Sequence, residues 1–172
     1  MVTAEELNAL SKRVLDAAYA VHSELGAGLL ESTYVACLLY ELRKRGLKVE
    51  TEVAVPVIYD RTKMVDVGYR MDMLIEGELV LEVKAVEGIS PAHHAQLVTY
   101  LKHSNKRLGL LLNFNEPYLK DGICRKVNRL CNGKEQEGRE DRQVSAKIAK
   151  KYVANFAGSF FAIFASFLSF GA

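Results

Sequence analysis

Cysteine is scarce in this chain of 172 residues. The three cysteines, Cys37, Cys124 and Cys131, form an odd number and contain no C-x-x-C pair. This pattern argues against a disulfide framework and against a zinc ribbon, and it is typical of proteins in a reducing cytosol. A charged-then-apolar leader is also missing, since Glu5 and Glu6 stand near the start. We therefore expect a cytoplasmic protein without a secretory signal.

A strong excess of one charge is missing as well. The net charge is +2, and the stretch 134–151 supplies it with six basic and four acidic residues. Proteins that bind nucleic acid through non-specific phosphate contacts usually carry a larger basic excess. The composition thus leaves only local basic patches for such binding, for example Arg43, Lys44 and Arg45. A hydrophobic content of 49% and a charged content of 26% indicate an ordinary globular domain.

Two common functional patterns are not found. Ser90 and Ser104 lack the nearby His–Asp context of a serine hydrolase. The segment Gly26-Ala-Gly28 follows a predicted helix instead of a strand, so it does not form a dinucleotide-binding loop. The pair His93-His94 can offer at most one ligand to a metal, because adjacent helical residues face different directions. We interpret the pair as polar residues at a helix start.

The hydrophobic periodicity predicts two helices followed by a three-stranded meander. Thr3 and Glu6 form a capping box for a helix that Gly26 ends, and a second helix runs from near Leu30 to Gly46. Alternation then predicts three strands, within about 49–59, 65–73 and 79–85, with the second one turning at Gly77 into the third. In the second strand, one face is expected to be buried and apolar; it carries Val65, Val67, Tyr69, Met71 and Met73.

The remaining pattern completes an α/β domain. Ser90-Pro91 is a strong helix start, and that helix is expected to reach about His103. The apolar run 108–114 predicts a strand buried on both faces, and 123–127 can form an edge strand. We therefore predict one domain over residues 1–132, a sheet wrapped by helices, without internal repeats.

The last forty residues differ in character. Residues 133–151 are polar and charged and are interpreted as a linker. Residues 152–172 form an apolar, phenylalanine-rich tail, for which we expect disorder or a single helix. Twenty residues just reach across a bilayer as a helix, so a membrane tether and a homo-oligomer contact remain open.

Three charged residues carry the chemistry. Glu82 and Lys84 are two apart on a predicted strand and so share a face, and a hairpin at Gly77 brings Asp72 opposite Glu82. Charges in the middle of a sheet cost stability unless they are paired or bind a metal. Carboxylates suit Mg²⁺ or Mn²⁺, which polarise a phosphoryl oxygen and activate water, and Lys84 can offset developing charge. The bland alternative is an exposed Glu–Lys ion pair worth little.

Further polar residues strengthen this hypothesis. Gln96 and Tyr100 share one face of the third helix at i and i+4 spacing. Glu31 lies in the first turn of the second helix, where it can simply favour the helix dipole, and Tyr34 can simply belong to the core.

At this point the motifs match a known family. Gly28-x-x-Glu31-x-x-Tyr34 resembles the signature of the GxxExxY proteins. Asp72…Glu82-Val-Lys84 resembles the PD-(D/E)xK nuclease motif, and Gln96-x-x-x-Tyr100 resembles the Q-x-x-x-Y motif of its RecB-like branch. The resemblance covers about residues 7–130. It implies a restriction-endonuclease-like core of helix, three-stranded meander, helix and strand, here with an extra N-terminal helix.

The resemblance also implies roles. Glu31, Asp72 and Glu82 would bind the metal, Mg²⁺ or Mn²⁺, with Lys84 as the catalytic lysine beside Asp72 and Glu82. Gln96 and Tyr100 would contact substrate or order Lys84, and the substrate would be nucleic acid, DNA in the first place. Met71 replaces the family's proline, and three scattered cysteines imply no iron–sulfur cluster. The alternatives are a non-catalytic nuclease-fold binding module and a scaffold built on the tail.

Overall fold

The computed structural model describes residues 2–59 and 62–128. The predicted linker 133–151 and the predicted tail 152–172 lie outside the described residues. The described elements are α1 (Ala4–Leu25), α2 (Glu31–Lys44), β1 (Val49–Tyr59), β2 (Thr62–Ile75), β3 (Leu79–Lys84), α3 (Pro91–His103), β4 (Leu108–Asn113), η1 (Leu119–Gly122) and β5 (Ile123–Val127). This order confirms the predicted α/β core with its additional N-terminal helix.

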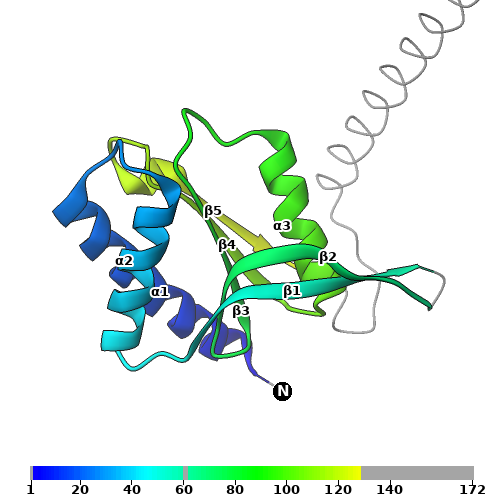
Figure 1. The fold of residues 1–172 in the computed structure, drawn as a ribbon. Coiled ribbons are helices and arrows are strands. Elements are labelled where there is room, and N and C mark those ends of the chain that lie inside the picture. Colours follow the sequence, from blue (N-terminus) through cyan, green and yellow to red (C-terminus); the bar gives the residue numbers. More distant parts are fainter. Residues whose placement is uncertain (1, 60–61, 129–172) are drawn as a thin grey trace, which may run out of the picture. The chain divides into compact units, whose positions relative to one another are not determined.

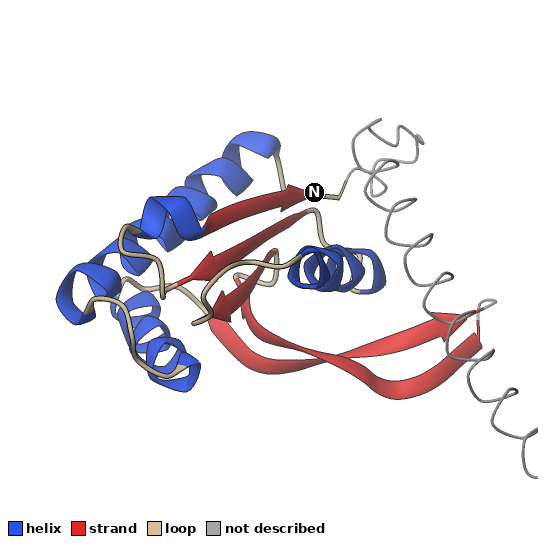
Figure 2. Ribbon diagram, turned by 90° about the horizontal axis from the view of Figure 1, so that it is seen from above, coloured by secondary structure: helices blue, strands red, loops and turns tan. Residues whose placement is uncertain are grey.

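One five-stranded sheet organises the domain, with its strands side by side in chain order from β1 to β5. Strands β3 and β4 are parallel, and the other neighbours are antiparallel. Parallel neighbours need a crossover, which α3 supplies. Helices α1 and α2 cover one face of the sheet and α3 covers the other, as Figures 1 and 2 show. A strand in the middle of the sheet is therefore covered on both sides.

The helix starts follow the predicted capping chemistry. In α1 the Thr3 hydroxyl accepts a hydrogen bond from the Glu6 amide at 3.1 Å, and the Glu6 carboxylate accepts one from the Thr3 amide at 2.7 Å. In α3 the Ser90 hydroxyl accepts from the His93 amide, and His93 Nδ1 accepts from the Ser90 amide at 3.2 Å. The interpretation of His93 as a polar residue of a helix start is thus confirmed.

The two parallel strands are the most deeply buried part of the fold. Every residue of β4 is buried, which confirms the strand predicted from the apolar run, and β3 is buried up to Lys84. On β3, Leu81 and Val83 pack with residues of α1 and α2, while Val80 packs against α3. Because neighbouring residues alternate between faces, Glu82 and Lys84 point to the α3 side together with Val80.

The prediction of one buried apolar face along β2 is wrong. Met73 packs in the cluster under α1 and α2, whereas Met71 packs with α3, so the ribbon changes faces between them. The side chains of Val65, Val67 and Tyr69 are exposed, at 47%, 48% and 40%. The hairpin of β1 and β2 leaves the sheet here and projects past α3 (Figure 2).

The backbone explains this change of face. Glu52 has a positive φ of 53°, and it lies between the cross-strand pairs Thr51–Met73 and Val53–Met71. Such a left-handed residue rotates the strand locally. A second irregularity follows at Pro56, where the pairing register shifts, as expected for a proline on an edge strand. β2 pairs with β3 only over residues 73–75, so the outer hairpin is not anchored in the sheet.

Across residues 2–59 and 62–128, no helix is both long and apolar enough to span a lipid bilayer.

Candidate functional site

The register between β2 and β3 brings the two predicted carboxylates together. Met73 pairs with Leu81 and Ile75 with Leu79, so one further step places Asp72 across from Glu82. The regular ladder ends at that step, and Asp72 Oδ2 instead accepts a hydrogen bond from the Val83 amide at 2.8 Å. The predicted hairpin about Gly77 is therefore confirmed, and the Asp72 side chain takes the place of a backbone partner.

The ammonium group of Lys84 contacts its own strand, β3, and the start of α2. Its Nζ lies 2.9 Å from Glu82 Oε1 and 3.4 Å from Glu31 Oε1, and it also donates to the Val83 carbonyl at 2.9 Å. Glu31 reaches the site from the first turn of α2, more than fifty positions earlier in the sequence. The structure thus brings Glu31 and Glu82 into contact with Lys84, and Asp72 is held next to this pair by the Val83 amide.

The exposure of the charged residues increases from Glu82 to Glu31. Glu82 is 1% exposed, the Lys84 side chain is 12% exposed and the Glu31 side chain is 42% exposed. In the part of the chain that the structure describes, Glu82 Oε2 is a buried side-chain atom without a hydrogen-bond partner. A buried carboxylate oxygen in that state costs free energy. It is an available acceptor for a cation.

The charges of the site do not balance. Burial raises the pKa of Glu82 to about 7, and the neighbouring charge of Asp72 adds to this, against the opposing effect of Lys84. Burial also raises the pKa of Asp72, in spite of its hydrogen bond from the Val83 amide. Burial alone would lower the pKa of Lys84, but the hydrogen bond and charge of Glu82 raise it overall, which keeps the ammonium charged. Three carboxylates around one ammonium carry a formal charge of −2 when all are ionised, and one divalent cation neutralises it.

A metal site with three or more ligands is not preassembled. Among residues 2–59 and 62–128, no group of three His, Cys, Asp or Glu side chains is arranged to hold an ion. Lys84 Nζ instead lies between Glu82 and Glu31. The donor set still fits a hard divalent ion, because it offers carboxylate oxygens and includes the unpartnered Oε2 of Glu82.

Gln96 and Tyr100 meet each other on α3, as their spacing predicts. The Gln96 amide donates a hydrogen bond to the Tyr100 hydroxyl. Tyr100 is buried, and burial is the main reason why its pKa is raised. The Tyr100 ring packs against the exposed ring of Tyr69 on β2, with the ring centroids 5.7 Å apart. The ring of His103, which is also on α3, lies 6.4 Å from that of Tyr69. Gln96 is the more accessible member of the pair.

The sequence model of the PD-(D/E)XK nuclease superfamily matches residues 8–126. The chain belongs to this superfamily. The match begins in α1 and ends in β5, so it contains all six residues of the candidate site. Comparison with curated proteins and with solved structures gave no significant match. Membership in the PD-(D/E)XK superfamily indicates a nuclease-type function, a nucleic-acid substrate and the general use of divalent metal ions.

Asn113 is a residue of this superfamily domain that the sequence analysis missed. It is fully buried at the end of β4, beside Lys84 in the parallel pairing. Its side chain accepts from the Val86 amide at 3.0 Å and donates to the Val86 carbonyl at 2.8 Å. The loop that follows Lys84 is therefore fixed to the next strand. A polar residue at the end of an apolar run was the available signal, since parallel strands end at the same edge of a sheet.

The segment around Asn113 leaves no space for a larger residue at Gly122. A Cβ atom there would lie 2.4 Å from the Asn113 carbonyl oxygen and 2.9 Å from Glu116 Cγ. We expect Gly122→Ala to lower the free energy of unfolding by about 1–3 kcal/mol, because the backbone of the superfamily core must shift. Denaturant unfolding would measure this. Gly88→Ala is the matched control, since its Cβ would meet nothing within 4 Å. Equal stability of both variants would contradict the prediction.

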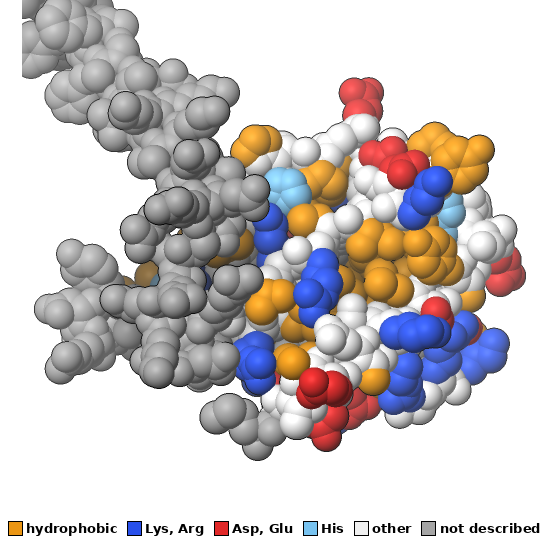
Figure 3. All heavy atoms as spheres, turned by 180° about the vertical axis from the view of Figure 1, so that it is seen from behind, with side chains coloured by type: hydrophobic (Ala, Val, Ile, Leu, Met, Phe, Trp, Pro, Cys, Tyr) orange, Lys and Arg blue, Asp and Glu red, His pale blue; other side chains and the backbone are white. Residues whose placement is uncertain are grey.

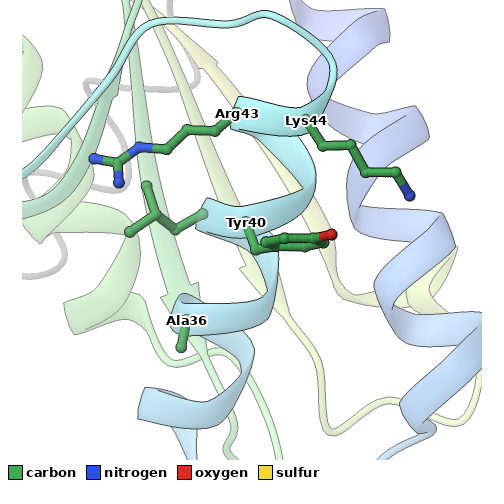
Figure 4. A pocket seen from close by; sticks show the side chains of 5 residues that line it. Ala36, Tyr40, Arg43 and Lys44 are labelled. Atoms are coloured by element: carbon green, nitrogen blue, oxygen red, sulfur yellow. The ribbon is translucent and has the colours of Figure 1, made fainter.

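A shallow hollow on the outer face of α2 is separate from these residues. It is lined by Ala36, Leu39, Tyr40, Arg43 and Lys44 (Figure 4). The predicted basic patch at this helix end is partly neutralised, because Lys44 and Arg45 both form ion pairs with Glu41. Figure 3 shows the molecule from behind relative to Figure 1; on this face Lys and Arg side chains lie at several places, the largest group at the lower right, with acidic side chains near them. The carboxylate–lysine cluster therefore remains the candidate site of this superfamily member.

His94, the second histidine of the pair, contacts β5 and not the carboxylate cluster. Its Nδ1 lies 3.3 Å from Cys124 Sγ on β5. Burial lowers the pKa of His94 and raises the pKa of Cys124, so both groups favour their neutral forms. This pair links α3 to the edge strand of the nuclease domain.

Proposed function

We propose that the protein is a Mg²⁺- or Mn²⁺-dependent nuclease that hydrolyses phosphodiester bonds of nucleic acid, with DNA as the first substrate to test. One observation carries the proposal: the carboxylates of Glu31 and Glu82 contact Lys84, Asp72 is hydrogen-bonded to the neighbouring Val83 amide, and the buried Glu82 Oε2 has no partner within the described chain. A buried site with an excess of negative charge favours a divalent cation, which competes there with the proton that Glu82 holds at lower pH. Superfamily membership supplies the reaction class.

Each residue of the cluster receives a role in this proposal. Asp72 and Glu82 of the sheet and Glu31 at the start of α2 would hold the cation. When bound, the divalent ion polarises the phosphoryl oxygens and makes its water more acidic. Lys84, whose raised pKa keeps it charged, orients the attacking water and stabilises negative charge that develops on the phosphoryl group.

The finer family assignment is part of the proposal. Gly28, Glu31 and Tyr34 have the spacing of the GxxExxY proteins, and Gln96 and Tyr100 have that of the RecB-like branch. Tyr100 is buried and accepts a hydrogen bond from Gln96. We therefore propose that Tyr100 orients Gln96 and that Gln96 makes the direct contact with substrate. This assignment favours the hydrogen-bonding role of the motif over stacking by Tyr100.

The test is cleavage of labelled single- and double-stranded DNA and RNA with Mg²⁺ or Mn²⁺, and with chelator. Wild-type protein is expected to cleave only with metal. Asp72→Asn removes a ligand charge and is expected to lower the Mn²⁺ affinity, measured by calorimetry, at least about tenfold. Asp16→Asn is the matched control, since Asp16 is an exposed partner of Lys12 on α1.

The possible outcomes separate the proposal from its main alternative. Cleavage that is equal in wild type and Asp72→Asn would be due to a contaminant and would overturn the proposal. Binding of Mn²⁺ and of nucleic acid without any cleavage would indicate a non-catalytic binding module on the nuclease fold. Absence of Mn²⁺ binding, even with nucleic acid present, would remove the metal centre altogether.

A further inference from the structure

The short loop between α1 and α2 is closed by the side chain of Tyr34. Tyr34 lies on α2, one turn after Glu31, and is fully buried. Its ring stacks on Phe114 at the end of β4, with the centroids 4.7 Å apart and the planes inclined by 22°. The ring is therefore fixed in the core beneath the end of β4, and its hydroxyl points back at the loop.

The hydroxyl forms two hydrogen bonds to the loop backbone. It donates to the Gly26 carbonyl at 2.7 Å and accepts from the Leu29 amide at 3.1 Å. Gly26 and Gly28 have φ values of 69° and 97°, a backbone region that residues with a Cβ rarely adopt. The loop is thus a tight turn made possible by glycine, and one buried hydroxyl ties its two ends together.

The start of α2 depends on this tie. Its N-cap residue, Leu30, has no side chain that can accept a hydrogen bond from the first turn. A helix start without such a cap is prone to fraying. Glu31 is the first residue of the helix, directly after the loop, and it must reach Lys84 Nζ from there. In this position a small change of the loop moves the Glu31 carboxylate.

We propose that Tyr34 is a positioning residue, whose hydroxyl holds the 26–29 loop so that Glu31 is presented to Lys84 and to the cation of the site. This inference rests on the proposed function for the role of Glu31. It accounts for the spacing of the Gly28, Glu31 and Tyr34 motif in physical terms. The glycine permits the turn, the glutamate is the ligand, and the tyrosine fixes the turn from the core.

The test uses Tyr34→Phe in the full chain, which keeps the stacked ring and removes only the hydroxyl. The expected result is a folded protein whose Mn²⁺ affinity, measured by calorimetry, is about tenfold lower, as for other residues that orient metal ligands. In a Glu31→Gln background the same substitution should have no further effect, because Tyr34 acts through Glu31. Tyr40→Phe on the exposed side of α2 is the matched control and should bind Mn²⁺ as wild type does.

A second measurement does not need the metal. The carboxyl carbon resonance of Glu31 in metal-free protein should shift in Tyr34→Phe and stay in place in Tyr40→Phe. Wild-type affinity together with an unshifted Glu31 resonance in folded Tyr34→Phe would overturn the inference, and so would additive effects with Glu31→Gln. If wild-type protein does not bind Mn²⁺, the proposed function fails, whereas the Glu31 resonance still decides whether Tyr34 positions this side chain.

Discussion

Replacing Lys84 with methionine is expected to slow phosphodiester cleavage by about 10²–10³-fold without weakening Mn²⁺ binding. Methionine keeps most of the apolar stem and removes the ammonium group, which lies 2.9 Å from Glu82 and 3.4 Å from Glu31. The loss follows because the charge that stabilises the transition state is gone. Binding is retained or tightened, because the three carboxylates then have no competing internal cation.

The measurement compares single-turnover cleavage with Mn²⁺ affinity in the same preparations. Lys12→Met is the matched control, since Lys12 forms an exposed ion pair on α1. It should change neither quantity. Removal of Lys84 leaves buried carboxylates without their partner and destabilises the metal-free protein, so circular dichroism at saturating Mn²⁺ must show a folded variant. Wild-type cleavage by a folded Lys84→Met protein would exclude a catalytic role for the lysine.

The sequence contained enough information for the centre of the site. The alternation of apolar residues predicts that Glu82 and Lys84 share a face of the strand. Gly77 predicts the hairpin that brings Asp72 beside them. Both are local properties, because strand parity and turn position depend on a few neighbouring residues. The structure confirms them through the pairing of β2 with β3 and through the bond from the Val83 amide to Asp72.

The course of the β1–β2 hairpin outside the sheet could not be predicted from such local patterns. Parity predicts that Met71 and Met73 share a face, and they do not, because Glu52 on the partner strand adopts a positive φ. Glutamate gives no local signal for that conformation. The exposure of Val65 and Val67 was unpredictable for a different reason, since apolar alternation shows which residues share a face but not whether anything covers it.

Long-range contacts were the other part that the sequence left open. The sequence leaves open whether Tyr34 is simply a core residue, and its ring does belong to the core. Its hydroxyl bonds and its stacking on Phe114 depend on the packing of α2 against the end of β4, eighty positions further along the chain. The place of Asn113 beside Lys84 likewise depends on the parallel pairing of β3 and β4.

The stability of the metal-free protein is expected to fall as the pH rises from about 4.5 to about 7. Glu82 has its pKa raised to about 7 by burial and by Asp72, so the folded state holds this proton more tightly than the unfolded chain does. The stabilisation is fully present below the unfolded pKa of 4.5 and is lost as the pH passes the folded pKa. The shift corresponds to about 3 kcal/mol, or roughly 10 °C in the melting temperature.

Glu82→Gln tests this coupling, because glutamine keeps the shape of the side chain and cannot titrate. Melting temperatures at pH 5 and pH 8 should differ much less in Glu82→Gln than in wild type, while Glu24→Gln on the exposed side of α1 should behave as wild type. Mn²⁺ should restore the stability of wild type at pH 8, since it binds the ionised carboxylates of the folded state only. Glu82→Gln should lose most of this gain. A wild-type melting temperature that is flat with pH in chelator would mean that Glu82 is ionised at no cost, and the cluster would then not need a divalent cation to be stable.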